Sequence, residues 1–240
     1  MFIPIHDINP LRRIETPIVT YALIFACTAI FVVFQSGYFV EANRASIAGF
    51  SMIPAELRLS VGLRHHFSVI PESLTVVTYM FLHGGWMHLI GNMLFLWVFG
   101  DNVEDAMGHF RFLVFYLAAG VAGGLAHMLS APNSTIPLVG ASGAIAGVVA
   151  AYLILHPRVK IWVLVLARFP VKITAMWVLS AWAVFQVVML LVASDHTTAW
   201  WAHIGGFVAG AVLVPFMRKP GVPLFDQDLP AEPPPDLRTS

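Results

Sequence analysis

The sequence predicts an all-α membrane protein: a bundle of six transmembrane helices with both termini in the cytoplasm. Three observations carry this prediction. Of 240 residues, 58% are hydrophobic and only 11% are charged, whereas soluble domains carry about 25% charged residues. Six apolar runs are long enough, or nearly so, to cross a bilayer, for which about 20 residues suffice. The Lys and Arg residues between these runs gather on one side of the predicted membrane.

Composition also excludes several classes of protein. Thirteen Lys and Arg balance thirteen Asp and Glu, so the chain lacks the basic surface of a nucleic-acid-binding protein. Cys27 is the only cysteine, which excludes an intrachain disulfide framework.

The chain begins with a polar segment, residues 1–16, which we place in the cytoplasm. The first apolar run, Pro17–Gly37, exceeds the apolar core of about 7–15 residues that a cleaved signal peptide has, so it predicts a retained span. Residues 38–72 then form an outer loop with scattered apolar residues, which predict short interfacial helices. A connection of this length is unusual and suggests a function.

Five further apolar runs follow this loop. The predicted spans are residues 74–99, 112–129, 139–155, 173–192 and 199–217. The acidic residues Asp101, Glu104 and Asp105 are expected after the end of the second span, and a tight turn is expected at 130–138. The run Ile161–Ala167 is too short to cross, so we place it at the interface. Residues 218–240 are rich in proline and predict a disordered cytoplasmic tail.

The orientation follows from positive charge. With the N-terminus inside, only three arginines of the first loop lie outside, and the remaining cations flanking the spans lie inside. The inside cations are Arg12, Arg13, Arg111, Arg158, Lys160, Arg168, Lys172, Arg218 and Lys219.

Five polar residues lie within the predicted spans, where such side chains are costly and usually face a bundle interior or a water-filled cavity. His83, His88 and Asn92 lie in the second span, Ser142 in the fourth and His203 in the sixth. These three spans run in the same direction, from outside to inside. All five residues are therefore expected near the outer surface at a similar depth.

Ser142 and His203 have the residue types of a nucleophile and its base. A serine hydroxyl becomes a useful nucleophile when a base lies within hydrogen-bond reach. Gly140 and Gly143 leave the Ser142 hydroxyl unshielded. No aspartate is expected at the depth of His203, so an enzyme of this kind would use a Ser-His dyad.

The serine and histidine spans also carry small residues at four-residue spacing. Gly143 and Gly147 repeat in the fourth span, and Gly206 and Gly210 repeat in the sixth. Small residues at this spacing allow two helices to approach closely, so these two spans are expected to pack against each other.

His88 and Asn92 are four residues apart, which places both on one helix face. Together with the Ser142 N–H they can stabilise the oxyanion of a tetrahedral intermediate. Simpler interpretations exist for each residue alone: a packing serine, a proton-relay histidine, or a metal site at His83 and His88, although five-residue spacing does not place these two on one face. None of these interpretations explains the shared depth.

Three segments together resemble the signature segments of the rhomboid intramembrane serine proteases. They are His83–Asn92 (HGGWMHLIGN), Gly140–Gly143 (GASG) and Ala202–Gly206 (AHIGG), in the family's order. The resemblance covers residues 74–217. It implies a six-helix protease domain over 17–217, with residues 38–72 as a membrane-embedded outer loop.

The resemblance also assigns roles. It implies that Ser142 is the nucleophile, His203 the general base, His88 and Asn92 the oxyanion site, and His83 a support of the same pocket. The family cleaves single-span proteins within or just outside the lipid bilayer and needs no metal or cofactor. The expected location is a bacterial plasma membrane, with the active site open to the outer side.

The chain departs from the family pattern in two places. Ala146 replaces a tyrosine that stacks on the histidine in some members, and a Trp-Arg pair of the first loop is absent. Two alternatives remain: an inactive rhomboid-like protein that binds transmembrane helices, and a small transporter. Inactive homologues typically lack the serine or the histidine, and this chain has no intramembrane carboxylate or inverted repeat of the kind that many transporters have.

Overall fold

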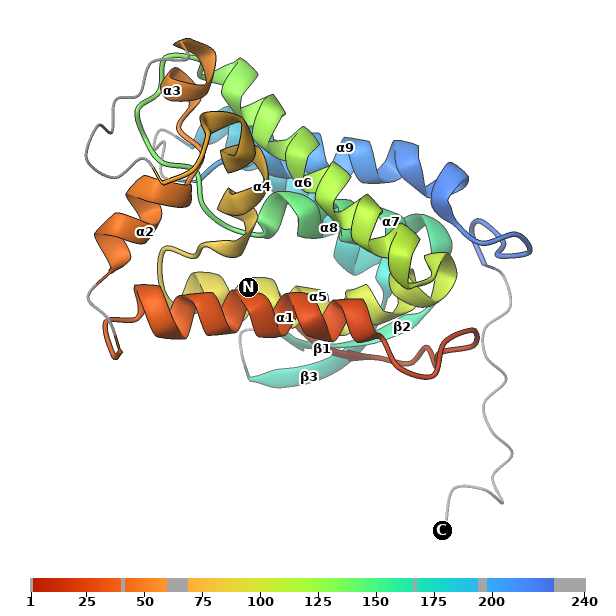
Figure 1. Cartoon of the computed structure of the whole chain (residues 1–240). Coiled ribbons are helices and arrows are strands. Elements are labelled where there is room, and N and C mark those ends of the chain that lie inside the picture. Colours follow the sequence, from red (N-terminus) through yellow and green to blue (C-terminus); the bar gives the residue numbers. More distant parts are fainter. Residues whose placement is uncertain (1, 40–41, 60–68, 166–167, 194–197, 227–240) are drawn as a thin grey trace, which may run out of the picture.

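The computed structural model describes residues 2–39, 42–59, 69–165, 168–193 and 198–226 (Figure 1). One long helix lies in each predicted span. The helices are α1 (Ile18–Ile30), continued by the π-helical turn η1 (Phe31–Gln35), α5 (Trp86–Met107), α6 (His109–Ser130), α7 (Ser142–Leu155), α8 (Ala175–Val192) and α9 (Trp200–Met217).

Four of these helices are long and apolar enough to cross a membrane: α1 with η1, α6, α8 and α9. Helix α5 has 22 residues but carries several polar ones, and α7 has 14 residues. The chain is therefore a mostly helical, multi-pass membrane protein.

Helix α7 occupies the centre of the bundle, where it contacts α5, α6, α8 and α9. Eleven of its 14 residues are buried, so it has no polar face, as expected for a helix enclosed by others. Helix α8 is the opposite case, because only Ala175, Leu179 and Gln186 are buried in it. Ser142 is the first residue of α7, so its backbone is held by a helix that other helices enclose.

The prediction of an all-α fold was wrong in one region, which forms a three-stranded antiparallel sheet. Strands β1 (Phe2–Asp7), β2 (Lys160–Val165) and β3 (Phe169–Thr174) lie in the order β1-β2-β3. The predicted interfacial run at 161–167 is thus mainly strand β2. The alternation of Val and Ile in β2 favours a strand, but its partner β1 comes from the other end of the chain. Residues 166–167 lie outside the described residues.

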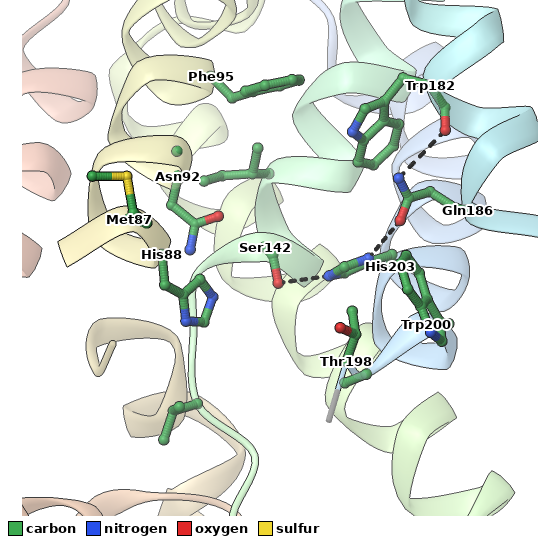
Figure 2. A pocket seen from close by; sticks show the side chains of 14 residues that line it. Met87, His88, Asn92, Phe95, Ser142, Trp182, Gln186, Thr198, Trp200 and His203 are labelled. Atoms are coloured by element: carbon green, nitrogen blue, oxygen red, sulfur yellow. Dashed lines mark hydrogen bonds between the residues drawn. The ribbon is translucent and has the colours of Figure 1, made fainter. Parts of the chain in front are cut away.

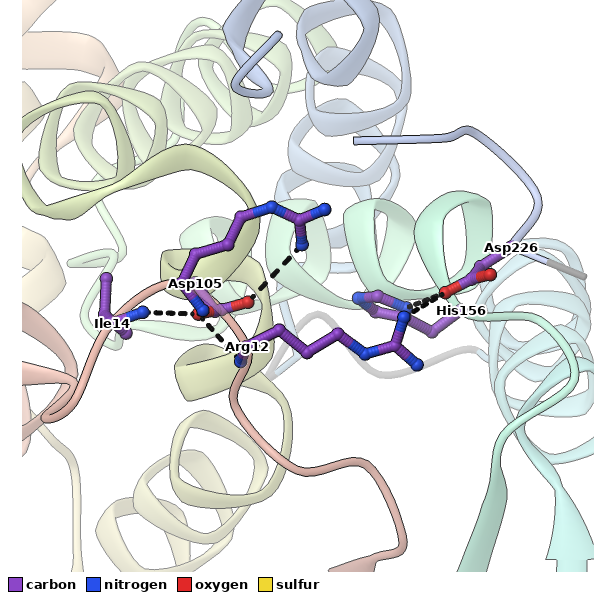
Figure 3. A network of polar contacts seen from close by, with 6 residues as sticks. Arg12, Ile14, Asp105, His156 and Asp226 are labelled. Atoms are coloured by element: carbon purple, nitrogen blue, oxygen red, sulfur yellow. Dashed lines mark hydrogen bonds and ion pairs between the residues drawn. The ribbon is translucent and has the colours of Figure 1, made fainter. Parts of the chain in front are cut away.

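The predicted cytoplasmic segment 1–16 is therefore part of the packed fold. Strand β1 contacts α5, and the backbone N–H groups of Arg12, Arg13 and Ile14 donate to one oxygen of Asp105, at 3.2, 2.6 and 2.8 Å. Figure 3 shows this carboxylate beside Arg12 and Ile14. Local sequence alone does not predict these contacts, because each joins residues about 90 positions apart.

The second predicted span, 74–99, differs at both ends. It begins with short turns, η2 (Glu72–Leu74), α4 (Thr75–Thr78) and η3 (Tyr79–Phe81), and α5 starts only at Trp86. Helix α5 continues through Gly100 to Met107, so the acidic residues expected after the span belong to its last turns.

The longer helix places Glu104 beside the N-terminus of α1. Its buried carboxylate accepts hydrogen bonds from the backbone N–H of Val19 (2.9 Å) and from both the N–H (2.8 Å) and the hydroxyl (2.7 Å) of Thr20. His109 Nδ1 lies 2.5 Å from the same carboxylate. The first N–H groups of a helix lack partners within it. Glu104 accepts hydrogen bonds from two of these N–H groups in α1, those of Val19 and Thr20, and so links α1 to α5.

The outer loop contains the expected short helices, α2 (Asn43–Phe50) and α3 (Pro54–Leu59). With α4 they gather at one end of the bundle, on the left of Figure 1. Residues 40–41 and 60–68 of this loop lie outside the described residues.

The prediction that residues 218–240 form a disordered tail is wrong for the first part of this segment, which packs against the bundle. The N–H of Lys219 donates to the carbonyl of Ala106 (2.8 Å), and that of Phe225 donates to Ile154 (2.7 Å). Val222 is buried. Asp226 lies 3.7 Å from Arg12 and 3.9 Å from His156 (Figure 3). Residues 227–240 lie outside the described residues.

A pH-dependent stability is expected from Asp7. Burial raises the pKa of its carboxyl from 3.8 to about 7, although the Tyr152 hydroxyl donates a hydrogen bond to it at 2.5 Å, which lowers the pKa. The folded state therefore binds this proton more tightly than the unfolded state, so the carboxyl destabilises the fold as pH rises from about 4 to 7. Asp7→Asn should then stabilise the protein more at pH 8 than at pH 5, by roughly 2 kcal/mol.

Thermal or denaturant unfolding of both proteins in one detergent measures this difference. His156 acts in the opposite direction, because burial lowers its pKa to about 4. Comparing wild type with Asp7→Asn at each pH removes that shared contribution. An equal effect of the substitution at pH 5 and pH 8 would contradict the prediction.

Candidate active site

A cavity of about 410 Å³ opens between α5, α7, α8 and α9 (Figure 2). Its polar lining comes mainly from the residues singled out in the sequence, together with one glutamine. These lining residues are His88, Asn92, Ser142, Gln186 and His203. His88, Asn92, Ser142 and His203 lie in the first two turns of their helices, so one end of the bundle carries the site.

Ser142 and His203 are hydrogen-bonded, with 2.9 Å between Ser142 Oγ and His203 Nε2. Ser142 is the first residue of α7 and therefore lies at the N-terminus of this helix, near the predicted outer end of the fourth span. At this position the unpaired N–H groups of the first turn and the positive end of the helix dipole lie beside the hydroxyl. Such an end favours negative charge developing on a neighbouring oxygen.

The other nitrogen of His203 also has a partner. Nδ1 lies 2.7 Å from the side-chain oxygen of Gln186 on α8, and the Gln186 amide nitrogen donates to the carbonyl of Trp182 at 3.4 Å. The rings of Trp182 and Trp200 lie 6.4 and 5.9 Å from the imidazole. These contacts hold His203 where Ala146 leaves no aromatic ring.

Sequence reasoning missed Gln186, although a signal was present. Apart from Ser180, Gln186 is the only polar residue between Ala175 and Val192. A polar side chain in an apolar span usually faces the bundle interior or a cavity and often has a function. Its distance from the three signature segments concealed its place in the site.

His88 and Asn92 lie on the side of Ser142 opposite His203 (Figure 2). Gly140 brings the Ser142 segment against them: its φ is +121°, and a Cβ there would lie 2.6 Å from His88 Nε2. Among the described residues, the buried amide nitrogen of Asn92 has no hydrogen-bond partner. A buried donor without a partner beside a candidate nucleophile is free to donate a hydrogen bond to an oxyanion.

His83 does not line this cavity. Its ring is buried and packs against His88, with ring centroids 5.3 Å apart, and its backbone N–H donates to Gln35 at 3.0 Å. His83 therefore contacts His88 from outside the cavity.

The glycines of α7 and α9 let these two helices touch. A Cβ on Gly147 would lie 3.1 Å from the Gly206 carbonyl, one on Gly210 would lie 2.5 Å from Gly147 Cα, and one on Gly206 would overlap the Gly143 carbonyl. A Cβ on Gly143 would lie 3.3 Å from the Ala202 carbonyl. This close approach brings the first turns of the two helices together and so places His203 beside Ser142.

The chain matches known proteins over the same region. The family model described as "Rhomboid domain" matches residues 71–220. Rhomboid-like protein 11, chloroplastic, from Arabidopsis thaliana is 33% identical over 71% of this chain and 60% of its own length. Rhomboid protease GluP from Bacillus subtilis is 45% identical over 32% of this chain and 15% of its own length. Rhomboid-like protease 3 from Toxoplasma gondii is 29% identical over 60% of this chain and 51% of its own length.

In each of these cases the chain covers less than two thirds of the relative's own length. The matched segment contains the whole cavity lining and the helices α5 to α9 that build it. The chain belongs to the rhomboid family.

Proposed function

We propose that this protein is an intramembrane serine endopeptidase that cleaves single-span membrane proteins with a Ser142–His203 dyad. The observation that carries the proposal is the 2.9 Å hydrogen bond between these side chains in a cavity that is also lined by His88 and Asn92. A histidine that only relays protons needs no nucleophile beside it, and a serine that only packs needs no base. The proposed roles explain why the two side chains are hydrogen-bonded to each other.

In the proposed mechanism, Ser142 Oγ attacks the scissile carbonyl carbon while His203 Nε2 takes the hydroxyl proton. The carbonyl oxygen becomes an oxyanion, which receives hydrogen bonds from the His88 ring, the Asn92 amide and the Ser142 N–H. His203 then gives its proton to the leaving amine, and an acyl-enzyme remains. Water, deprotonated by His203, attacks the ester, and the acid product leaves as Ser142 regains its proton.

The surroundings of the cavity support this class of substrate. The substrate must reach a site at the end of a bundle whose outer surface is apolar. A membrane-embedded polypeptide is therefore favoured over a soluble one. A peptide bond within an intact helix is shielded by its own hydrogen bonds. We therefore expect substrates that unwind readily near the membrane surface. No metal or cofactor takes part in these steps.

We further propose six membrane crossings, with the N-terminus inside and residues 17–217 as the protease domain. Two features support this orientation: the candidate site lies at one end of the bundle, and Arg13 and Arg111 contact Asp105 and the Arg218 carbonyl at the other end. The active site would then open to the outer side. The proposed location is a bacterial plasma membrane. The match to a Bacillus subtilis protease supports it, while other relatives carry chloroplastic and mitochondrial names.

Reconstitution in lipid vesicles with a labelled single-span substrate tests the function. Wild type should cleave the substrate, and Ser142→Ala should not. Ser130→Ala, which removes an exposed hydroxyl at the end of α6, should cleave like wild type. Equal cleavage by wild type and Ser142→Ala would reject the proposal. Binding of substrate without cleavage by wild type would favour the inactive helix-binding alternative.

A further inference from the structure

Gln186 is a polar side chain that α8 turns inward from an otherwise lipid-facing surface. Its neighbours Phe185 and Val187 are 52% and 46% exposed, whereas Gln186 is 5% exposed. Turning a large amide into a bundle of apolar side chains is costly unless the amide is hydrogen-bonded. Both ends of this amide are bonded, the oxygen to His203 and the nitrogen to the Trp182 carbonyl.

These two bonds determine which way the amide points. The nitrogen can only donate and the Trp182 carbonyl can only accept, so the amide oxygen faces His203 Nδ1. An oxygen at 2.7 Å accepts a hydrogen bond, so Nδ1 carries the proton of the neutral imidazole. Nε2 is then unprotonated and accepts the hydroxyl hydrogen of Ser142 at 2.9 Å. This tautomer is the one in which His203 can act as a base.

The reversed amide would have the opposite effect. An NH₂ group facing Nδ1 would favour the proton on Nε2, which would then donate to Ser142 and could not take its proton. In serine hydrolases with a carboxylate in this position, changing the carboxylate to an amide lowers turnover about 10⁴-fold for this reason. Here the Trp182 carbonyl prevents the reversal, because it holds the amide nitrogen on the far side.

We propose that Gln186 is a positioning residue that completes a Ser142–His203–Gln186 triad by fixing the tautomer and orientation of His203. This inference rests on the proposed function and deepens it. An amide suits this place because α8 faces lipid, where a buried carboxylate would be costly. Gln186 bonds directly to the base, so its loss should affect turnover more than substrate binding.

Two substitutions of similar size separate this role from simple packing. Gln186→Met keeps the volume but removes the acceptor, and we expect kcat to fall about 10²-fold with KM nearly unchanged. Gln186→Glu keeps an oxygen beside Nδ1, and we expect kcat within about threefold of wild type. A carboxylate also stabilises the imidazolium form, so the acid limb of its pH–rate profile should move to higher pH.

Ser180→Ala is the control, because it removes the other polar side chain of α8. It should leave kcat unchanged. Thermal unfolding of each variant in detergent shows whether the fold is retained. The rate of labelling by a fluorophosphonate probe, in which Ser142 Oγ attacks phosphorus and fluoride leaves, measures the reactivity of Ser142 without a substrate.

The outcomes distinguish the triad from the protease itself. Wild-type activity in Gln186→Met would overturn the triad, as would equal losses in Gln186→Met and Gln186→Glu. An unmoved acid limb in Gln186→Glu would also contradict it. If wild type neither cleaves the substrate nor reacts with the probe, the proposed function fails. A reactive wild type with an equally reactive Gln186→Met rejects the triad alone.

Discussion

His203→Ala should lower cleavage of a single-span substrate at least 10⁴-fold and should abolish labelling by a fluorophosphonate. His203 Nε2 is the nitrogen that lies 2.9 Å from Ser142 Oγ. Without it, no base is within reach of the hydroxyl proton, and a serine hydroxyl at its ordinary reactivity is a weak nucleophile. In a well-studied serine hydrolase, removal of the serine or the histidine alone costs about as much as removal of the whole catalytic unit.

The measurement uses single-turnover cleavage and probe labelling in the same vesicles. His6→Ala is a control, because His6 is an exposed histidine on β1 outside the cavity lining of the proposed site. It should retain wild-type rates. Persistent labelling of Ser142 in His203→Ala would show that another group activates the hydroxyl and would remove His203 from the proposed mechanism.

The sequence predicts the polar residues of the site well because polar residues are scarce in an apolar bundle. Ser142, His203, His88 and Asn92 each stand out against apolar neighbours, and in the structure they line one cavity. Gln186 has the same signal, but no glycine pattern lies near it, and it belongs to none of the three signature segments.

The remaining differences from the sequence prediction involve contacts between distant segments. Strand β1 pairs with β2, and Glu104 and Asp105 bind the backbone around α1. A hydropathy pattern describes how one segment meets lipid or water. It does not reveal that a carboxylate will find unpaired N–H groups on another helix, so α5 runs past its predicted end and residues 1–16 join the fold.

The packing contact on which the site depends most joins α7 and α9. Helices α7 and α9 each deliver one member of the dyad from their first turn, so the distance between Ser142 and His203 follows the distance between the helices. The closest approach is at Gly206, one turn along α9 from His203, where the Cα faces the Gly143 carbonyl. Gly143 is the residue after Ser142. A change at this point should therefore affect stability and activity together.

Gly206→Ala should destabilise the protein by about 3 kcal/mol or more and abolish cleavage. The added methyl group would overlap the backbone carbonyl of Gly143, which cannot rotate away as a side chain can, so the helices must separate. Gly91→Ala is the control for stability only, because Gly91 also lines the cavity of the proposed site. Its Cβ would meet nothing within 4 Å, and Ala is favoured over Gly in a helix by about 1 kcal/mol. Unfolding in detergent should thus show opposite signs for the two substitutions. If Gly206→Ala unfolds like wild type, the close contact of α7 with α9 does not set the position of His203. The claim that the glycine spacing of these helices places His203 beside Ser142 is then wrong.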